Sequence, residues 1–420
     1  MLKLIALVLF LVPALAPVAQ DPAPATPVNA PAPGGTPLDV MFVGNNWAGT
    51  ADVVDARTFE KLRTIDVVPD RQQRLNEILL DPVAAGFLLA IRGLVGQGND
   101  QFVDDMFSTP DGTLLAVSRP SLADVVGIDL ATEEIVWRFP MEGYRTDHMG
   151  VSPDGSRLLV SDSTANKVHE LDLRTGEKLR EFASGDTPHE NEYLEDGSKI
   201  FHASIGRVYV PGNLNPLGGA DAIVKGSQVF QIVDNETFEI EKRWDMGAEL
   251  DEAGYPGFSS AVRPMAIAPD ERYVYLQVSY HHGFVEFDTA GEGRVTRVAL
   301  LPQSEKAKSI PESRYVLNSA HHGLAMNEAG TTLCAAGTMS DYAAIVDRES
   351  FRHTIIPVGD KPYWSTTGVD GDTCWVSVSG TDQVVVIDYD SAEVIAEIPV
   401  GDHPQRVRAG TVSEGILSTW

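Results

Sequence analysis

A segment of about 40 residues repeats along most of this chain, and it limits the possible folds more than any other feature. Residues 151–171 read VSPDGSRLLVSDSTANKVHEL, which predicts a strand end, a tight Pro-Asp-Gly turn, a strand, a polar loop and a third strand that ends at Asp172. Each copy is followed by a turn and a fourth strand, such as residues 393–398. Four short strands per copy indicate the blades of an all-β propeller.

The copies can be aligned on their turns, and the alignment places one residue at the opening of each innermost strand. By subtraction, consecutive openings lie 43, 42, 74, 59, 41 and 42 residues apart, so two blades carry insertions. Seven openings predict a seven-bladed ring. They are Asp104, Asp147, His189, Arg263, His322, Tyr363 and Gln405.

The two ends of the repeat region are complementary. Residues 40–68 supply second, third and fourth strands but no first strand, whereas residues 405–410 supply a first strand alone. We expect the N- and C-terminal strands to join in one blade. Such a joint closes the ring and removes the open sheet edges that favour aggregation.

The repeat resembles that of the YVTN-type seven-bladed β-propellers, secreted bacterial proteins of the lactonase/WD40-like propeller superfamily. The shared pattern is P-x5-S-P-D-G-x2-L-x-V, then V-x2-I-D, with Val-Gly pairs such as Val358-Gly359 and Val400-Gly401 at the blade ends. The resemblance covers about residues 38–410 and implies the fold. It implies no single activity, because that family includes surface-layer, lactonase-like, lyase-like and binding proteins.

The N-terminal residues indicate export. Residues 1–19 contain one lysine, an apolar run and small residues, which is the pattern of a signal peptide and is too short for a membrane span. Residues 20–37 are rich in proline and alanine and predict an extended linker. The propeller then occupies residues 38–420, and we expect a secreted or periplasmic protein. A buried N-terminal strand is the alternative reading of residues 1–19.

Charge limits the partners. Sixty acidic residues against 32 basic residues give a formal charge of −28, which repels nucleic-acid phosphates and anionic membrane surfaces. We therefore do not expect a nucleic-acid partner. We further predict a monomer that binds a small molecule or glycan and has no membrane span. Cys334 and Cys374 fall in second strands of consecutive blades and could face each other as a disulfide; two free thiols are the alternative.

Long insertions are predicted on one face of the ring. In a propeller, the loop between second and third strands and the link between blades lie on the same face, and loops gathered on one rim often build a site. Within the first insertion, residues 71–80 and 83–95 have apolar residues at helical spacing. These two short helices form either a lid over the channel mouth or a packing element. The insertions span residues 69–102, 205–227, 248–262 and 301–320.

Polar side chains fill the predicted ring. Equivalent openings surround one axis, so residues far apart in the sequence become neighbours. A structural propeller would place small or apolar residues there, whereas this chain has acids, imidazoles, a phenol and guanidinium groups. For His169 and His353, outside the ring, we expect packing or surface roles. The residues one position further along are Asp105, His148, Glu190, Pro264, Gly323, Trp364 and Arg406.

Two kinds of chemistry fit these residues. In the first, His148, His189, Glu190 and His322 hold a divalent metal ion, since imidazole and carboxylate suit zinc, manganese or iron. In the second, no metal is needed: Arg263 holds an anionic substrate, and His322 or His189 acts with Tyr363 as base and acid. In both, the remaining ligand-binding residues are Asp104, Asp147, Trp364, Gln405 and Arg406.

The sequence leaves the activity open. It contains no G-x-S-x-G, H-E-x-x-H or Walker motif, which leaves serine-hydrolase, zincin and P-loop readings without support. We predict a secreted propeller that acts as a lyase or hydrolase on a small polar or sugar-like molecule. The alternative is a non-catalytic propeller that binds a ligand, a metal or a cell-wall component.

Overall fold

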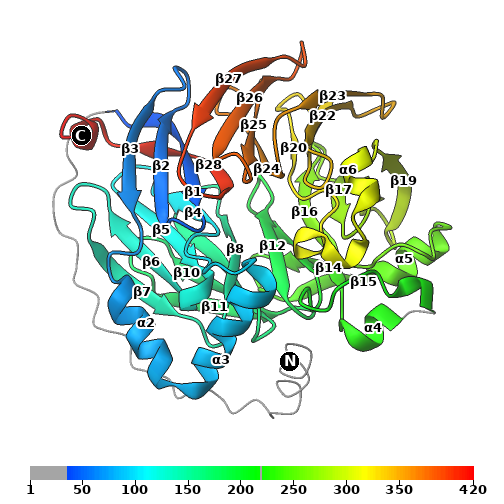
Figure 1. Ribbon diagram of the computed structural model, residues 1–420, viewed down its shortest axis with the longest axis horizontal. Helices are drawn as coiled ribbons and strands as arrows, with labels where there is room; N and C mark the ends of the chain where they lie inside the picture. Colours follow the sequence, from blue (N-terminus) through cyan, green and yellow to red (C-terminus); the bar gives the residue numbers. More distant parts are fainter. Residues whose placement is uncertain (1–35, 218–219) are drawn as a thin grey trace.

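Seven four-stranded antiparallel sheets form a closed ring in the computed structural model of the protein, which describes residues 36–217 and 220–420 (Figure 1). The predicted seven-bladed β-propeller is therefore confirmed. The predicted signal peptide lies outside the described residues.

The first blade joins the two ends of the chain. Its order is β28 (Pro404–Val412), β1 (Leu38–Asn45), β2 (Thr50–Asp55) and β3 (Lys61–Asp66), so the C-terminal strand is innermost. Pairing of β28 with β1 runs from Val412 opposite Leu38 to Pro404 opposite Asn45. The predicted closure by a C-terminal first strand is confirmed.

The other six blades each use four consecutive strands. From the axis outward, blade two contains β4 (Met106–Ser108), β5 (Leu114–Arg119), β6 (Asp124–Asp129) and β7 (Ile135–Pro140). Blade three contains β8 (Thr146–Val151), β9 (Arg157–Asp162), β10 (Lys167–Asp172) and β11 (Lys178–Ala183). Blade four contains β12 (Pro188–Tyr193), β13 (Lys199–Ser204), β14 (Val229–Asp234) and β15 (Ile240–Asp245). Blade five contains β16 (Val262–Ile267), β17 (Tyr273–Val278), β18 (Gly283–Asp288) and β19 (Arg294–Leu300). Blade six contains β20 (Leu324–Met326), β21 (Thr332–Gly337), β22 (Tyr342–Asp347) and β23 (His353–Pro357). Blade seven contains β24 (Pro362–Thr367), β25 (Thr373–Val378), β26 (Gln383–Asp388) and β27 (Val394–Pro399).

The apolar core lies between neighbouring blades. Middle strands are buried on both faces; β5 and β25, for example, have every residue buried. The Pro-Asp-Gly turns permit close approach at the blade ends. Gly112 has φ +63°, and a Cβ there would lie 2.5 Å from the backbone nitrogen of Ser413, so this turn accepts the chain that follows β28 only because it has no side chain.

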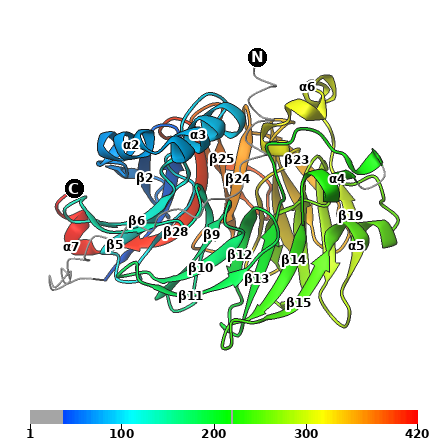
Figure 2. The same cartoon turned by 90° about the horizontal axis from the view of Figure 1, so that it is seen from below.

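All four insertions leave the ring at blade links or at second-to-third-strand loops, as the alignment predicts. Helices α2, α3 and α6 lie along the upper face in Figure 2, whereas α4 and α5 lie lower, at the right edge of the ring. The tight turns occupy the opposite face. The helical segments are α2 (Arg71–Leu80), α3 (Pro82–Ala90), η1 (Ile91–Val95), η2 (Pro120–Leu122), η3 (Asn215–Leu217), α4 (Ala220–Val224), α5 (Met246–Glu252), α6 (Glu305–Ser309), η4 (Glu312–Arg314), η5 (Val316–Asn318) and α7 (Glu414–Leu417).

The two helices of the first insertion form where their spacing predicts, but they pack over the second blade. Arg74 of α2 bonds Asp124 of β6 at 3.1 Å, and buried Arg119 joins Asp124 to Asp70 ahead of α2. None of the helical residues lines the central pocket described below; Gln101, beyond the helices, is the insertion's contribution. Of the two readings of these helices, these contacts support the packing element.

Cys334 of β21 and Cys374 of β25 form a disulfide between the sixth and seventh blades, with 6.4 Å between their Cα atoms. In the described part of the chain, no individual helix is long and apolar enough to cross a bilayer. Helix α2 and residues 82–95 have the required length and composition only when taken together, and the two are bent by 118° relative to each other.

Candidate functional site

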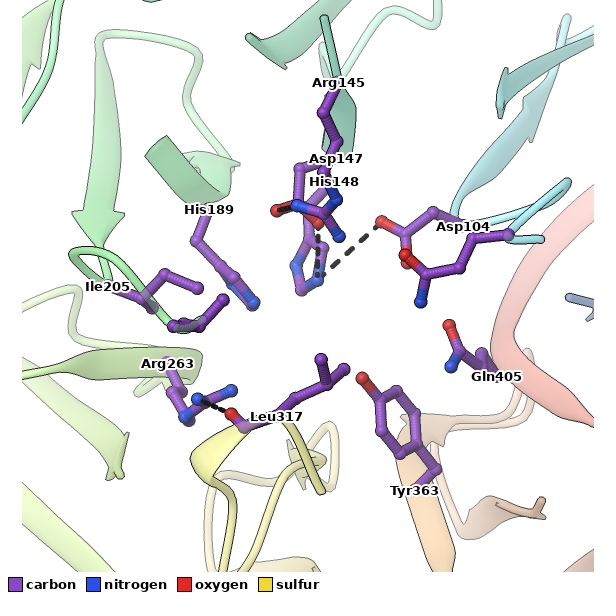
Figure 3. Close-up of a pocket in the computed structure, with 12 residues that line it drawn as sticks. Asp104, Arg145, Asp147, His148, His189, Ile205, Arg263, Leu317, Tyr363 and Gln405 are labelled. Atoms are coloured by element: carbon purple, nitrogen blue, oxygen red, sulfur yellow. Dashed lines mark hydrogen bonds and ion pairs between the residues drawn. The ribbon is translucent and has the colours of Figure 1, made fainter. Parts of the chain in front are cut away.

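A narrow pocket, partly open to solvent, lies on the ring axis at the face that carries the insertions (Figure 3). Charged and polar side chains from the inner strands form its walls, and apolar side chains from two insertions lie at its mouth. Its lining residues are Gln101, Asp104, Arg145, Asp147, His148, His189, Ile205, Val208, Arg263, Leu317, Tyr363 and Gln405.

Bulges at the starts of the inner strands explain why consecutive residues share this pocket. In a regular strand, neighbours point to opposite faces. In β8, the pairing with β9 jumps between Thr146 and Met149, so one extra residue is accommodated where Asp147 and His148 stand. Similar shifts occur in β12, β16 and β24. Bulges of this kind re-aim side chains, and here they turn them toward the axis.

Three histidines from three blades converge at the pocket, and two of them, His148 and His189, line it. His148, His189 and His322 are each at most 4% exposed, and one ring nitrogen from each lies within 4.8 Å of those of the other two. The rings of His148 and His189 have centroids 3.6 Å apart. Nδ1 of His189 and both ring nitrogens of His322 lack a hydrogen-bond partner among the described residues; the backbone of Tyr363 is near His322 without meeting hydrogen-bond geometry.

The Glu190 side chain, whose pKa is raised well above its usual value by burial, fixes the orientation of the His148 ring. Nδ1 of His148 lies 2.5 Å from Oε2 of Glu190, which is 1% exposed. This contact leaves Nε2 as the available ring nitrogen, 3.7 Å from Asp147 Oδ1 and 3.9 Å from Asp104 Oδ2. His148 therefore belongs to a second group of potential metal ligands, with Asp104 and Asp147.

Burial sets the charge of these histidines. It lowers the pKa of His148, His189 and His322 well below the usual value, and nearby arginines lower each pKa further. The three imidazoles are thus neutral at pH 7, which is the form that binds metal ions.

Two aspartates form the wall beside the histidines. Asp147 bonds Arg145 at 2.5 Å, and burial, which would raise the pKa of Asp147, is outweighed by the positive charges of Arg145 and Arg406, so its pKa is lowered. For Asp104, burial dominates and raises the pKa to about 7, against the opposing effect of Arg406. Asp104 can therefore exchange a proton near neutral pH.

Arg406 lies deeper in the channel and is fully buried. Its guanidinium carbon stands 4.0 Å from the centroid of the Trp364 ring, and Nη2 is 3.5 Å from Asp104 Oδ1. None of its three guanidinium nitrogens has a hydrogen-bond partner among the described residues. Groups of this kind in a channel are usually satisfied by water or a ligand.

The opposite wall consists of Arg263, Tyr363 and Leu317. Arg263 donates from Nε to Ser279 Oγ at 2.7 Å and from Nη2 to the Leu317 carbonyl. Tyr363 stacks on His322 with ring centroids 4.0 Å apart and, as Figure 3 shows, points its hydroxyl into the pocket. Burial raises the pKa of Tyr363 to about 12, so the phenol is protonated.

Most predicted site residues meet here, with three refinements. Glu190 stands behind His148, toward Nδ1, so we infer that it positions the histidine and is not itself a ligand. Trp364 and Arg406 lie below the pocket floor. His322 reaches the histidine group but does not line the pocket. Sequence reasoning missed five lining residues: Gln101, Arg145, Ile205, Val208 and Leu317. Of these, only Arg145, two residues before Asp147, has a position that the repeat could have indicated.

Comparisons with known proteins support the fold. No family model matches the chain, and no curated protein matches it, so membership of the YVTN family is not confirmed. Among solved structures, a chain of hydrazine synthase from Kuenenia stuttgartiensis is 17% identical, with 86% of this chain and 94% of that chain covered and a TM-score of 0.59. Dihydro-heme d1 dehydrogenase NirN in complex with DHE is 14% identical, with 95% and 80% covered and a TM-score of 0.52. At these identities the likeness concerns architecture alone.

Proposed function

We propose that the protein is an extracytoplasmic propeller that holds one divalent metal ion through His148, His189 and His322 and acts as a hydrolase or lyase on a small polar molecule. The convergence of three buried, neutral imidazoles from three blades carries this proposal. Tetrahedral coordination at zinc–nitrogen bonds of about 2.0 Å needs nitrogens roughly 3.3 Å apart, so small side-chain rotations complete the site.

The residues around the ion have complementary tasks. A divalent ion with three protein ligands keeps a position open and acts as a Lewis acid toward a ligand. Asp104, with an unpaired Oδ2 beside His148, is placed to accept a proton. Tyr363, protonated and facing the pocket, is placed to donate one. Because burial lowers the pKa of the three histidines well below the usual value, they are weak proton acceptors, which favours this scheme over one in which they are themselves bases.

Two observations support the proposed compartment. The Cys334–Cys374 disulfide fits an oxidising environment. Residues 1–19 have the composition of a signal peptide. Together they support a secreted or periplasmic location.

Metal analysis of the purified protein tests the ion site. We expect one bound zinc, manganese or iron per chain, and loss of that ion in His322→Ala. His321→Ala is the matched control, because His321 is the adjacent buried histidine and its Nε2 contacts the Tyr342 hydroxyl at 3.0 Å instead of joining the three histidines. A wild-type protein without stoichiometric metal, or a His322→Ala protein that retains it, would refute the site.

A turnover assay separates the enzyme from the non-catalytic alternative. Metal-loaded protein is incubated with a panel of esters, lactones and hydroxy acids, and Asp104→Asn is compared with the wild type. Cleavage by the wild type that falls at least about 100-fold in Asp104→Asn supports an enzyme. Bound metal with no turnover of any panel member supports a binding propeller.

A further inference from the structure

The guanidinium groups along the channel differ in their carboxylate partners. Arg145 pairs with Asp147, Arg406 lies 3.5 Å from Asp104, and Arg408 of β28 forms a double contact with Asp105 at 2.8 and 2.7 Å. Among the described residues, no carboxylate forms an ion pair with Arg263, which is 1% exposed. One buried cation of the pocket wall is thus left without an anion.

Such a cation is costly in the protein alone. A buried charge normally has a partner, because removal from water is not otherwise offset. Burial accordingly lowers the pKa of Arg263 to about 10, which leaves it protonated at neutral pH. Its two acceptors, Ser279 Oγ and the Leu317 carbonyl, are both uncharged.

The acceptor at Leu317 belongs to a strained part of an insertion. Leu317 and Asn318 both have left-handed backbone angles, φ 48° and 62°, which are unfavourable for residues with a side chain. Asn318 anchors this turn by donating from Nδ2 to the Val208 carbonyl at 3.0 Å. The turn therefore spans the pocket mouth from one insertion to another and presents one carbonyl to Arg263.

We infer that the ligand of this pocket is a small carboxylate, whose oxygens bind Arg263 in place of the Leu317 carbonyl. A single unpaired cation matches a monoanionic group, and a guanidinium binds carboxylate oxygens in a fork geometry that a carbonyl cannot fill. Tyr363 supplies a further donor across the pocket. The inference rests on the proposed function, of which it names the substrate class.

Titration with glycolate, its neutral analogue glycolamide, and inorganic phosphate tests this inference at low ionic strength. Binding is followed by calorimetry in wild type, Arg263→Gln and Arg263→Lys, each with metal and after chelation. We expect glycolate to bind the wild type at least about tenfold more tightly than glycolamide or phosphate, since loss of one charged hydrogen-bond pair typically changes affinity by this factor or more. Binding should be lost in Arg263→Gln and partly restored in Arg263→Lys.

Folding and the two proposals are kept apart in this design. Far-UV circular dichroism and the melting temperature of both variants establish whether they fold. If Arg263→Gln does not fold, Arg263→Lys still tests the inference, because it keeps the charge and lacks the guanidinium fork. Tighter phosphate binding, equal binding of glycolamide, or unchanged glycolate binding in Arg263→Gln would overturn the inference. If the wild type binds glycolate but no metal ion, only the ion site is refuted. If the wild type binds the metal ion but no glycolate, only the substrate class is refuted.

Discussion

Nδ1 of His148 and Oε2 of Glu190 lie 2.5 Å apart across the boundary between the third and fourth blades. Both side chains are 1% exposed, and they belong to the adjacent inner strands β8 and β12. A carboxylate behind a histidine fixes the ring orientation and makes the distal nitrogen a better ligand. The site is therefore assembled between blades and depends on the ring as a whole.

Removal of Glu190 should weaken metal binding without abolishing it. We expect Glu190→Ala to lower the affinity for zinc by about 10–100-fold, because the His148 ring loses its fixed orientation, and Glu190→Gln to lower it less, because the amide oxygen can still accept from Nδ1. Competition with a chelating dye measures this. Glu286→Gln is the control, since Glu286 is a buried glutamate bonded to Tyr275 and Arg297 outside the channel. Equal affinities in Glu190→Ala and the wild type would contradict the role.

The architecture could be predicted because its determinants are local and periodic. A tight turn and the strands on either side of it recur in each copy, so alignment alone gives the number of blades. The missing first strand before β1 identifies β28 as its partner. The docking of the first insertion could not be predicted. It depends on Arg74 and Arg119 meeting Asp124, and these contacts have no periodicity.

The site could be predicted in part for the same reason. The alignment identifies residues that open inner strands, including Asp147, His189 and Arg263. It does not show the bulges that turn two consecutive side chains inward, nor that Glu190 faces Nδ1 of His148. Leu317 comes from an insertion without a counterpart in other blades, so no repeat could indicate its place at the mouth.

Ring closure by β28 predicts that a chain ending at Gly401 does not fold. Such a chain lacks the innermost strand of the first blade and exposes the edge of β1, which pairs with residues 404–412. Near-UV circular dichroism and limited proteolysis will report the loss. A chain ending at Ser418 is the control and should remain folded, because β28 is intact. A cooperative melting transition in the shorter chain would refute the closure.

The disulfide predicts a stability difference between oxidised and reduced protein. Cys334 and Cys374 are 40 residues apart in sequence, and a link across a loop of that length stabilises by about 2–4 kcal/mol. Reductant should therefore lower the free energy of unfolding of the wild type by this amount, as measured by urea denaturation. Reductant should have no effect on Cys334→Ala/Cys374→Ala. Alkylation of two thiols in the denatured, unreduced wild type would contradict the bond.

Acid should destabilise the fold through buried histidines outside the pocket, of which His281 gives the clearest test. Its side chain is 9% exposed and its Nε2–H donates to the Ala299 carbonyl at 2.9 Å. Burial lowers the pKa of His281 to about 4, mainly because the charged ring is removed from water.

The sign follows from proton binding in the two states. Between pH 6.5 and about 4 the unfolded chain binds a proton at His281 that the folded chain does not, so the stability from this residue falls as the pH falls through that window. From pH 7 to pH 5 the loss is about 2 kcal/mol. His281→Gln keeps a donor for Ala299 and should lose that much less stability on acidification, as measured by urea denaturation at both values. His353→Gln, on the outer strand β23, is the control. An identical pH response in His281→Gln and wild type would show that His281 is not held neutral by the fold.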